Sequence, residues 1–265
     1  MNELRNAPVR VMAHLVAGYP ADTLALAAAE GLAAGGVSYF EIQLPFSDPS
    51  ADGVAIQTAC AAVLERGYRV AEGLAFAREL RRRYPAIPVY IMTYGNLAWK
   101  PGIERFVEMA AGAGASGLIV PDLPFDADEG LSAACEKRGL VSVPVAAPSM
   151  GPARVAALAA LDRPLVYAAL RAGITGKETA IDSDTLAFIA RLESAGPGKA
   201  GGESRVLGGF GIRNGAQAAT LAPHVRAVVA GSVFVEAIRD AAAGGEKAVF
   251  EAVKKKAAEL SGFGQ

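Results

Sequence analysis

A single acidic residue, Glu41, stands in the mostly apolar run Tyr39–Leu44. Side chains of a strand alternate between two faces, so Glu41 shares its face with Tyr39 and Gln43, while the opposite face is wholly apolar. The apolar face suits packing under helices, which leaves Glu41 pointing into the interior. A carboxyl group there is costly unless it is paired or protonated, and one that exchanges a proton readily can act as a general acid/base. A structural ion pair or a shifted strand boundary is the alternative.

A second carboxylate follows in a segment rich in turn residues. Asp52 lies in Pro45–Gly53, which leaves the end of the strand that carries Glu41. Two carboxylates would thus meet at one rim, one rooted in the wall and one on a loop. Asp48 and Asp52 are each followed by a turn-favouring residue, so a purely structural role of either aspartate is the alternative.

Two glycine-containing segments favour a site for an anion. Gly208–Ile212 follows one predicted strand, and Gly231-Ser232 follows the next and opens a helical pattern. Glycines let backbone N–H groups approach a phosphate closely, and the start of a helix attracts an anion. Either segment alone is weak evidence, but together they predict a phosphorylated substrate, over which Gly176 in a preceding long loop could close.

The sequence gives weaker support for further site residues and none for a metal site or a catalytic serine triad. Tyr94, Asn96 and Tyr167 end two further strands and are either site residues or rim residues with satisfied polar tips. His14 and His224 are isolated and no metal-ligand spacing is present, so a metal site is not expected. No Ser-His-Asp order with a nucleophile elbow is visible either.

The elements that must position these residues alternate along the chain. Short β-branched runs predict strands at Val9–Val16, Tyr39–Gln43, Val89–Thr93, Gly117–Val120, Val141–Val145, Leu165–Ala168, Val206–Gly208 and Ala227–Ala230. Longer helical patterns include Thr23–Ala34, Ile56–Arg66, Ala71–Arg83, Gly102–Ala113, Asp128–Arg138, Pro152–Leu161, Asp184–Ser194, Gly215–Leu221 and Glu246–Leu260.

This alternation predicts an α/β fold, a (β/α)8 TIM barrel that forms a single domain over residues 1–265. In that fold active sites lie at the carboxyl ends of the strands, and the loops after strands seven and eight commonly bind phosphate. A doubly wound open sheet is the alternative, but the first strand ends in Ala17–Pro20 without the usual glycine-rich turn. The long loop Arg171–Asp182 is a candidate lid, and Gly196–Ser204 is expected to be a flexible surface connection.

Composition excludes several classes of protein. Hydrophobic residues make up 52%, enough for a large core, and 26 Lys and Arg nearly balance 27 Asp and Glu, so no charge pattern for nucleic acid or an anionic membrane is present. Cys60 and Cys135 fit buried small hydrophobes. No signal sequence and no apolar run of roughly 18 residues occurs, which favours a soluble protein in the reducing cytoplasm.

One segment resembles a known family signature. The run Glu41–Gly53 is similar to Glu-Leu-Gly-(Val/Ile)-Pro-Phe-Ser-Asp-Pro-x-Ala-Asp-Gly of the tryptophan synthase alpha chains. Met92–Asn96, Leu118–Pro124, Arg171–Gly176 and Gly209–Ile212 match further family segments in order. The likeness covers nearly the whole chain, and the first segment is highly specific.

The resemblance implies a lyase that cleaves indole-3-glycerol phosphate to indole and glyceraldehyde 3-phosphate by a retro-aldol reaction. It makes Glu41 the acid/base at the indole C3 and the glyceryl hydroxyl, and Asp52 the acceptor of the indole N–H that stabilises the protonated ring. The substrate-binding residues implied are Tyr94, Tyr167, Thr175, Gly176, Phe210, Gly211, Gly231 and Ser232.

The resemblance also implies a partner. The family works with a beta chain in an alpha2-beta2 heterotetramer, and Pro45, Asp48 and Pro124 would face that chain. It implies no cofactor for this chain, because protonation of the ring makes indole a leaving group, and the pyridoxal phosphate of the complex belongs to the beta chain.

Two residues depart from the family pattern. Gln43 stands where the family has glycine, and its amide would fill substrate space or hydrogen-bond Glu41. His14 stands where an apolar aromatic residue, typically phenylalanine, lines the indole pocket. Both changes make the pocket more polar, which predicts a tuned or weakened site. A poorly active homologue kept as a regulatory partner of a beta chain, or a barrel enzyme for another phosphosugar, are the alternatives.

Overall fold

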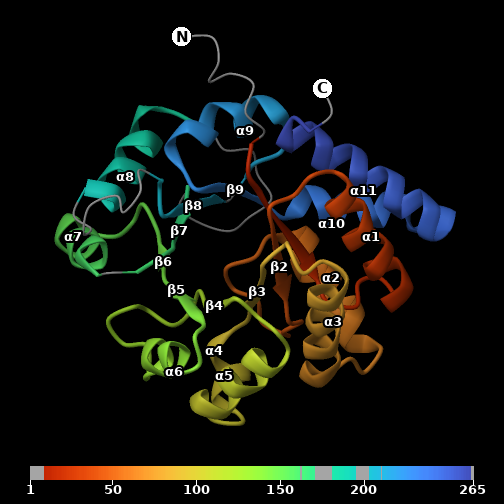
Figure 1. Cartoon of the computed structure of the whole chain (residues 1–265), viewed down its shortest axis with the longest axis horizontal. Coiled ribbons are helices and arrows are strands. Elements are labelled where there is room, and N and C mark those ends of the chain that lie inside the picture. The colour runs from red at the N-terminus through yellow and green to blue at the C-terminus, as the bar shows by residue number, and fades with distance from the viewer. Residues whose placement is uncertain (1–8, 162, 171–180, 195–202, 210, 264–265) are drawn as a thin grey trace.

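The computed structural model describes residues 9–161, 163–170, 181–194, 203–209 and 211–263. Its centre is one sheet in which every neighbouring pair of strands is parallel, in the order β5-β4-β3-β2-β1-β9-β8-β7-β6. The strands are β1 Val11–Val16, β2 Tyr39–Gln43, β3 Val89–Met92, β4 Gly117–Ile119, β5 Val141–Val143, β6 Val145–Ala146, β7 Val166–Ala169, β8 Val206–Gly209 and β9 Ala227–Ala230. Figure 1 shows the helices arranged around these strands.

The two edge strands of the sheet are consecutive in the sequence, and this connection closes the barrel. Strands β5 and β6 lie at the two ends of the sheet, yet only Pro144 separates them in sequence. Proline has no N–H to donate, which interrupts the ladder, although its carbonyl still accepts a hydrogen bond from the backbone N–H of Tyr167 at 2.9 Å. The predicted strand Val141–Val145 is therefore two short strands that close a barrel, and the predicted (β/α)8 fold is confirmed.

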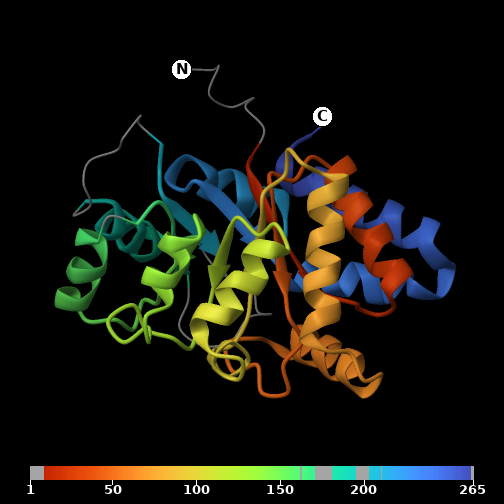
Figure 2. The ribbon, with the colours of Figure 1, turned by 60° about the horizontal axis from the view of Figure 1, so that its bottom comes forward.

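Most helices follow the predicted ranges with small shifts at their ends, whereas α4 was not predicted and α10 was predicted only by its start at Gly231-Ser232. The helices are α1 Asp22–Ala34, α2 Val54–Glu65, α3 Val70–Arg83, α4 Gly95–Trp99, α5 Ile103–Gly112, α6 Leu131–Lys137, α7 Pro152–Ala160, α8 Ser183–Ser194, α9 Gly215–Leu221, α10 Ser232–Ala241 and α11 Gly245–Ser261. Helix α6 starts three residues later than Asp128 because Glu129 and Gly130 have φ of 52° and 83°, outside the helical region. Figure 2 shows the strands running between flanking helices.

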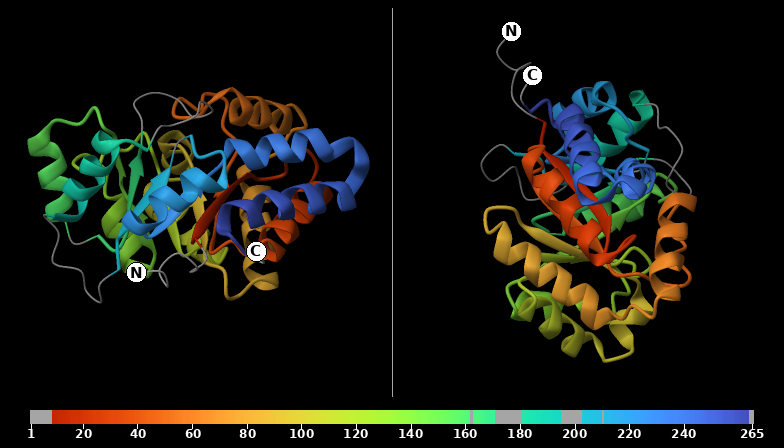
Figure 3. Two further views of the ribbon diagram at one scale, coloured as in Figure 1. Left: turned by 90° about the horizontal axis from the view of Figure 1, so that it is seen from above. Right: turned by 90° about the vertical axis from the view of Figure 1, so that its right-hand side faces the viewer.

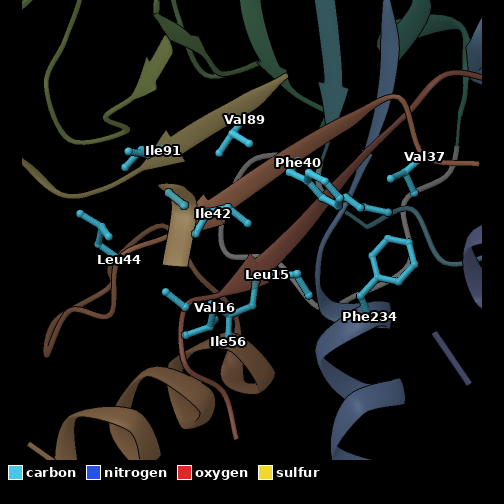
Figure 4. Packing of buried hydrophobic residues seen from close by; sticks show 14 of the residues in the cluster. Leu15, Val16, Val37, Phe40, Ile42, Leu44, Ile56, Val89, Ile91 and Phe234 are labelled. Atoms are coloured by element: carbon cyan, nitrogen blue, oxygen red, sulfur yellow. The ribbon is translucent and has the colours of Figure 1, made fainter. Parts of the chain in front are cut away.

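The buried apolar side chains form two clusters, one between the strands and the helices and one inside the barrel. Phe40, Ile42 and Leu44 are fully buried in the outer cluster between strands and helices, and Figure 4 shows them beside Leu15 and Ile91. The inner cluster fills the barrel with side chains such as Met12, Tyr90, Met92, Ile119, Tyr167 and Leu207. Alternation along β2 thus directs its apolar side chains outward and leaves Glu41 and Gln43 for the interior.

The first and last described segments meet on the flank of the barrel. Helix α11 packs along α1, as Figure 3 shows, and the backbone N–H of Val9 donates to the carbonyl of Ser261 at 2.8 Å. None of the helices in the described part of the chain has the length and apolar character needed to cross a bilayer.

Candidate active site

A cavity lies at the carboxyl ends of the strands, the face where barrel enzymes bind their substrates. The space between its walls, with the open solvent at its mouth included, is about 640 Å³. The lining residues are His14, Glu41, Ala51, Asp52, Ile56, Met92, Ile119, Pro121, Val145, Tyr167, Gly211, Ile212, Arg213, Val229, Gly231 and Ser232. The walls are mostly apolar, and the polar groups form two sets.

The first set begins with Glu41, which lines the cavity from β2 and is 3% exposed. Its neighbour on β1, in direct register, is His14, which is 4% exposed and lines the same cavity. His14 Nδ1 and Glu41 Oε2 are 3.4 Å apart. The buried carboxylate therefore has one adjacent group that can carry a positive charge.

The charge on His14 follows from this pairing. Burial lowers the pKa of the His14 imidazole, but the charge of Glu41 and the hydrogen bond to it outweigh that effect, with a smaller contribution from Asp52. The net result is a pKa above the ordinary value of histidine. Pairing with Glu41 thus favours the imidazolium form inside the barrel.

Asp52 reaches the cavity from the loop before α2 and is 3% exposed. Its Oδ2 accepts hydrogen bonds from Gln43 Nε2 at 2.8 Å and from the Tyr94 hydroxyl at 2.7 Å. Burial raises the pKa of Asp52, and the hydrogen bonds and the charge of His14 oppose that rise without cancelling it. These hydrogen bonds to Asp52 hold the loop in place. The raised pKa means that the Asp52 carboxyl group gives up its proton less readily than an exposed aspartate.

Tyr94, which lies between β3 and α4, holds the same loop. Its hydroxyl accepts a hydrogen bond from the backbone N–H of Ala51 at 3.1 Å, and its ring stacks on Phe46 with the centroids 5.2 Å apart. Tyr94 is fully buried and is not among the cavity-lining residues. Its contact is with Asp52, so in this structure it positions a site residue.

Gln43 also acts through Asp52. Its Nε2 donates to Asp52 and lies 3.5 Å from Cys60 Sγ, so the amide hydrogen-bonds Asp52 and not Glu41. Gln43 is fully buried and does not line the cavity. The amide that replaces the family glycine is therefore packed behind the site, where it orients a carboxylate.

Tyr167 lines the cavity from β7 because the facing strand carries a glycine. A Cβ at Gly209 would lie 2.4 Å from the Tyr167 hydroxyl oxygen, so a side chain there would displace the ring. Burial, with the negative charges of Glu41 and Asp52, raises the pKa of Tyr167 far above its usual value. The phenol stays protonated and can donate a hydrogen bond.

The second set lies after β8 and β9. Gly211 has a φ of 86°, which favours glycine, and Gly231 and Ser232 begin helix α10, whose N-terminus faces the cavity. Sequence reasoning missed Arg213, which also lines the cavity and pairs with Glu236 at 2.6 Å. A cation two residues after the predicted phosphate-binding glycine was the signal that could have found it.

The remaining predicted residues lie elsewhere. Thr175, Gly176 and Phe210 fall outside the described residues. Asp48 and Pro124 are exposed, whereas Pro45 is buried in the isolated chain, and Asn96 is exposed at the start of α4. Cys60 and Cys135 are buried free thiols, as predicted. The described ranges contain no group of three or more His, Cys, Asp or Glu side chains placed to hold a metal ion.

The chain is similar to known proteins along nearly its whole length. The family model for the tryptophan synthase alpha chain matches residues 3–262. A tryptophan synthase alpha chain from Leifsonia xyli is 39% identical over 86% of this chain and 85% of its own, and one from Helicobacter hepaticus is 36% identical over 87% and 86%.

Solved structures give the same result. Tryptophan synthase from M. tuberculosis, in an open form, has a TM-score of 0.80 at 29% identity, covering 97% of this chain and 94% of that one. A mutant tryptophan synthase alpha-subunit from Pyrococcus furiosus has a TM-score of 0.81 at 26% identity, covering 97% and 99%. The resemblance seen in the sequence is thereby confirmed.

Proposed function

Because the chain belongs to the tryptophan synthase alpha chain family, lyases of tryptophan biosynthesis, we propose that it cleaves indole-3-glycerol phosphate to indole and glyceraldehyde 3-phosphate. The observation that carries the proposal is one cavity with two buried carboxylates, Glu41 and Asp52, on one side and glycine backbone on the other. Carboxylates can move protons and anchor a ring nitrogen, and glycine N–H groups can hold a phosphate.

Glu41 takes the central role in this proposal. Cleavage requires a proton at the indole C3 and removal of a proton from the adjacent glyceryl hydroxyl. The carbon–carbon bond then breaks, its electron pair returns to the indole ring, and the hydroxyl oxygen becomes the aldehyde oxygen. Glu41 lies in the wall of the cavity, where a carboxylate can serve these transfers.

Asp52 and Tyr167 handle the ring. The Asp52 carboxylate accepts the indole N–H and stabilises the positive charge that forms when C3 is protonated. Its fixed position, held by Gln43 and Tyr94, means that no reorganisation is needed as that charge develops. The protonated Tyr167 phenol adds a donor on the opposite wall.

The phosphate binds at the second set of residues. Gly211, Gly231 and Ser232 line the cavity, and the N-terminus of α10 favours an anion. Arg213 contributes a positive charge at the same wall. We assign Thr175, Gly176 and Phe210 to the same substrate on the resemblance alone.

The proposed setting is a cytoplasmic alpha2-beta2 complex. We propose that this chain needs no cofactor and that the pyridoxal phosphate chemistry belongs to the beta chain. Asp48 and Pro124 offer exposed contacts for that partner, while Pro45 would shape the backbone between the strand and the loop that meets it.

A cleavage assay on the purified chain, alone and with a beta chain, tests the proposal. We expect indole release in both cases, faster with the partner, and tight binding of indole-propanol phosphate. No cleavage in either case combined with faster beta-chain turnover would leave the regulatory alternative. Tight binding of a non-indolic sugar phosphate without binding of indole-propanol phosphate would favour a different substrate.

A further inference from the structure

Among the described residues that line the cavity, His14 is the polar one that the proposed reaction does not use. It lies opposite Glu41 in the register of β1 and β2, with Nδ1 at 3.4 Å from Glu41 Oε2. Its other ring nitrogen, Nε2, is buried and has no hydrogen-bond partner among the residues that the structure describes. The imidazole of this cavity-lining residue therefore has one nitrogen beside the carboxylate and one buried nitrogen without a partner.

An unpaired buried nitrogen calls for a ligand. Leaving a buried donor without a partner costs about 1–3 kcal/mol, and an apolar ring of similar size would fill the same place without that cost. The neighbouring wall residues Ile56 and Val229 are apolar, and a Cβ on Gly231 would touch the imidazole Cγ at 3.4 Å. The Gln43 side chain interacts with the imidazole and helps to raise its pKa, yet neither His14 Nε2 nor Gln43 Oε1 has a hydrogen-bond partner of good geometry among the described residues. A substrate bound in the cavity that His14 lines would supply a partner for Nε2.

We propose that His14 and Glu41 form a two-member acid–base pair, in which the His14 imidazolium gives the proton to the indole C3 and the Glu41 carboxylate takes the proton of the glyceryl hydroxyl. This inference rests on the function proposed above and divides its two proton transfers between two residues. His14 then touches the substrate directly and is a catalytic residue.

The proton that His14 gives to the substrate is matched by the proton that Glu41 takes from it. His14 loses one proton to C3 and becomes neutral, and Glu41 gains one from the hydroxyl as the carbon–carbon bond breaks. The electron pair of that bond returns to the ring, and the O–H pair becomes part of the aldehyde carbonyl. Transfer from Glu41 back to His14 across their contact restores the starting state, with no external acid, base or oxidant.

The surroundings of His14 suit this cycle. Burial lowers the pKa of His14, whereas Glu41 from β2 raises it by its charge and a hydrogen bond, Asp52 from the following loop by its charge, and Gln43 by a hydrogen bond. Tyr167 from β7 lines the same cavity as a neutral phenol, and Arg213 lies among the lining residues after β8. The two nearest carboxylates therefore favour the charged donor form, which the first transfer requires.

Substitution of His14 tests the proposal through kcat and its pH dependence. His14→Phe fills the space without a proton donor, and His14→Asn keeps a polar group that cannot exchange protons. We expect each variant to lower kcat about 10²-fold with a small change in KM, and to remove one limb of the pH–rate profile. His224→Asn, at the exposed second histidine, should change neither.

A second measurement does not depend on turnover. The chain has only 2 histidines, so the imidazole resonances can be assigned with His224→Asn and titrated. We expect Glu41→Gln to lower the pKa of His14 clearly. An unchanged titration, or a His14→Phe enzyme with wild-type kcat and pH profile, would overturn the pair while leaving the lyase activity intact. Absence of cleavage in the wild type would instead overturn the proposed function, and the pair with it.

Discussion

The two sides of the cavity are built in different ways. On the side of β1 to β3, side chains from separate segments are joined, so that Gln43 and Tyr94 both hold Asp52 and His14 lies against Glu41. On the side of β8 and β9 the lining includes two glycines, Gly211 and Gly231, and, among the described residues, a single charged side chain, Arg213. We call these the acid side and the glycine side.

The difference reflects the two tasks proposed for them. Proton transfer needs two atoms within hydrogen-bond reach, so the acid side depends on which atoms its side chains carry. Phosphate binding needs close approach of N–H groups, so the glycine side depends on the absence of a Cβ. Changes on the acid side should therefore lower kcat, and changes on the glycine side should raise KM.

The largest effect should come from Glu41→Gln. Removal of the acid/base group should lower kcat by about 10²–10⁴-fold, because such catalysis is typically worth that factor. The fold should persist, since the amide occupies nearly the same volume in the wall of β2. Steady-state kinetics with a melting curve would check this, with Glu251→Gln on the exposed face of α11 as control. Residual activity above about 10% would remove Glu41 from the proposed role.

The second largest effect on kcat should come from Asp52→Asn. We expect this variant to be less active than the wild type but more stable at neutral pH. Loss of the charge opposite the indole N–H should lower kcat about tenfold to 10²-fold. The pKa of Asp52 is raised by burial, so the folded protein binds this proton more tightly than the unfolded chain. Ionisation of Asp52 therefore lowers the stability of the fold as the pH rises above 3.8, the ordinary pKa of an aspartate. Below that pH the carboxyl group is protonated in both states, and this loss of stability disappears.

The variant should thus melt higher than the wild type at neutral pH, and the gain should vanish toward pH 3.8. Thermal unfolding across this pH range measures it. Asp240→Asn, at an exposed aspartate outside the cavity, should alter neither quantity. A lower melting temperature at neutral pH would mean that the hydrogen bonds from Gln43 and Tyr94 stabilise the carboxylate more than burial destabilises it.

The two sides also differ in how far the sequence predicts them. Alternation along Tyr39–Leu44 places Glu41 inside, because a strand repeats every two residues whatever surrounds it. The contacts of Gln43 and Tyr94 with Asp52 were not predicted, because the path of the loop after β2 is not visible in the sequence and Tyr94 comes from a distant segment.

The closure of the barrel could be anticipated only in part. The count of strands predicted it, but the division of the fifth strand follows from Pro144, which the interior of a predicted strand Val141–Val145 should not contain. The start of α6 was misplaced because Glu129 takes a positive φ, a conformation that the sequence pattern does not reveal.

On the glycine side, Gly211→Ala should raise KM about tenfold with a smaller change in kcat. A Cβ at a φ of 86° strains the backbone, and the N–H groups around it lose their approach to the phosphate. Gly139→Ala is a matched control, because Gly139 also has a positive φ of 68° and its Cβ would meet open space. Equal loss of stability in both variants, with a raised KM only in the first, is the expected pattern.

Arg213→Ala should have the smallest effect and provides the sharpest test of the contrast between the sides. Arg213 is partly exposed and paired with Glu236, so solvent and the ion pair reduce its pull on a phosphate, and we expect KM to rise only about threefold. Glu236→Gln, which keeps the cation and removes its partner, should lower KM slightly. If Arg213→Ala instead raised KM more than Gly211→Ala, the glycine side would bind phosphate through a side-chain charge, and the two sides of the cavity would work on the same principle.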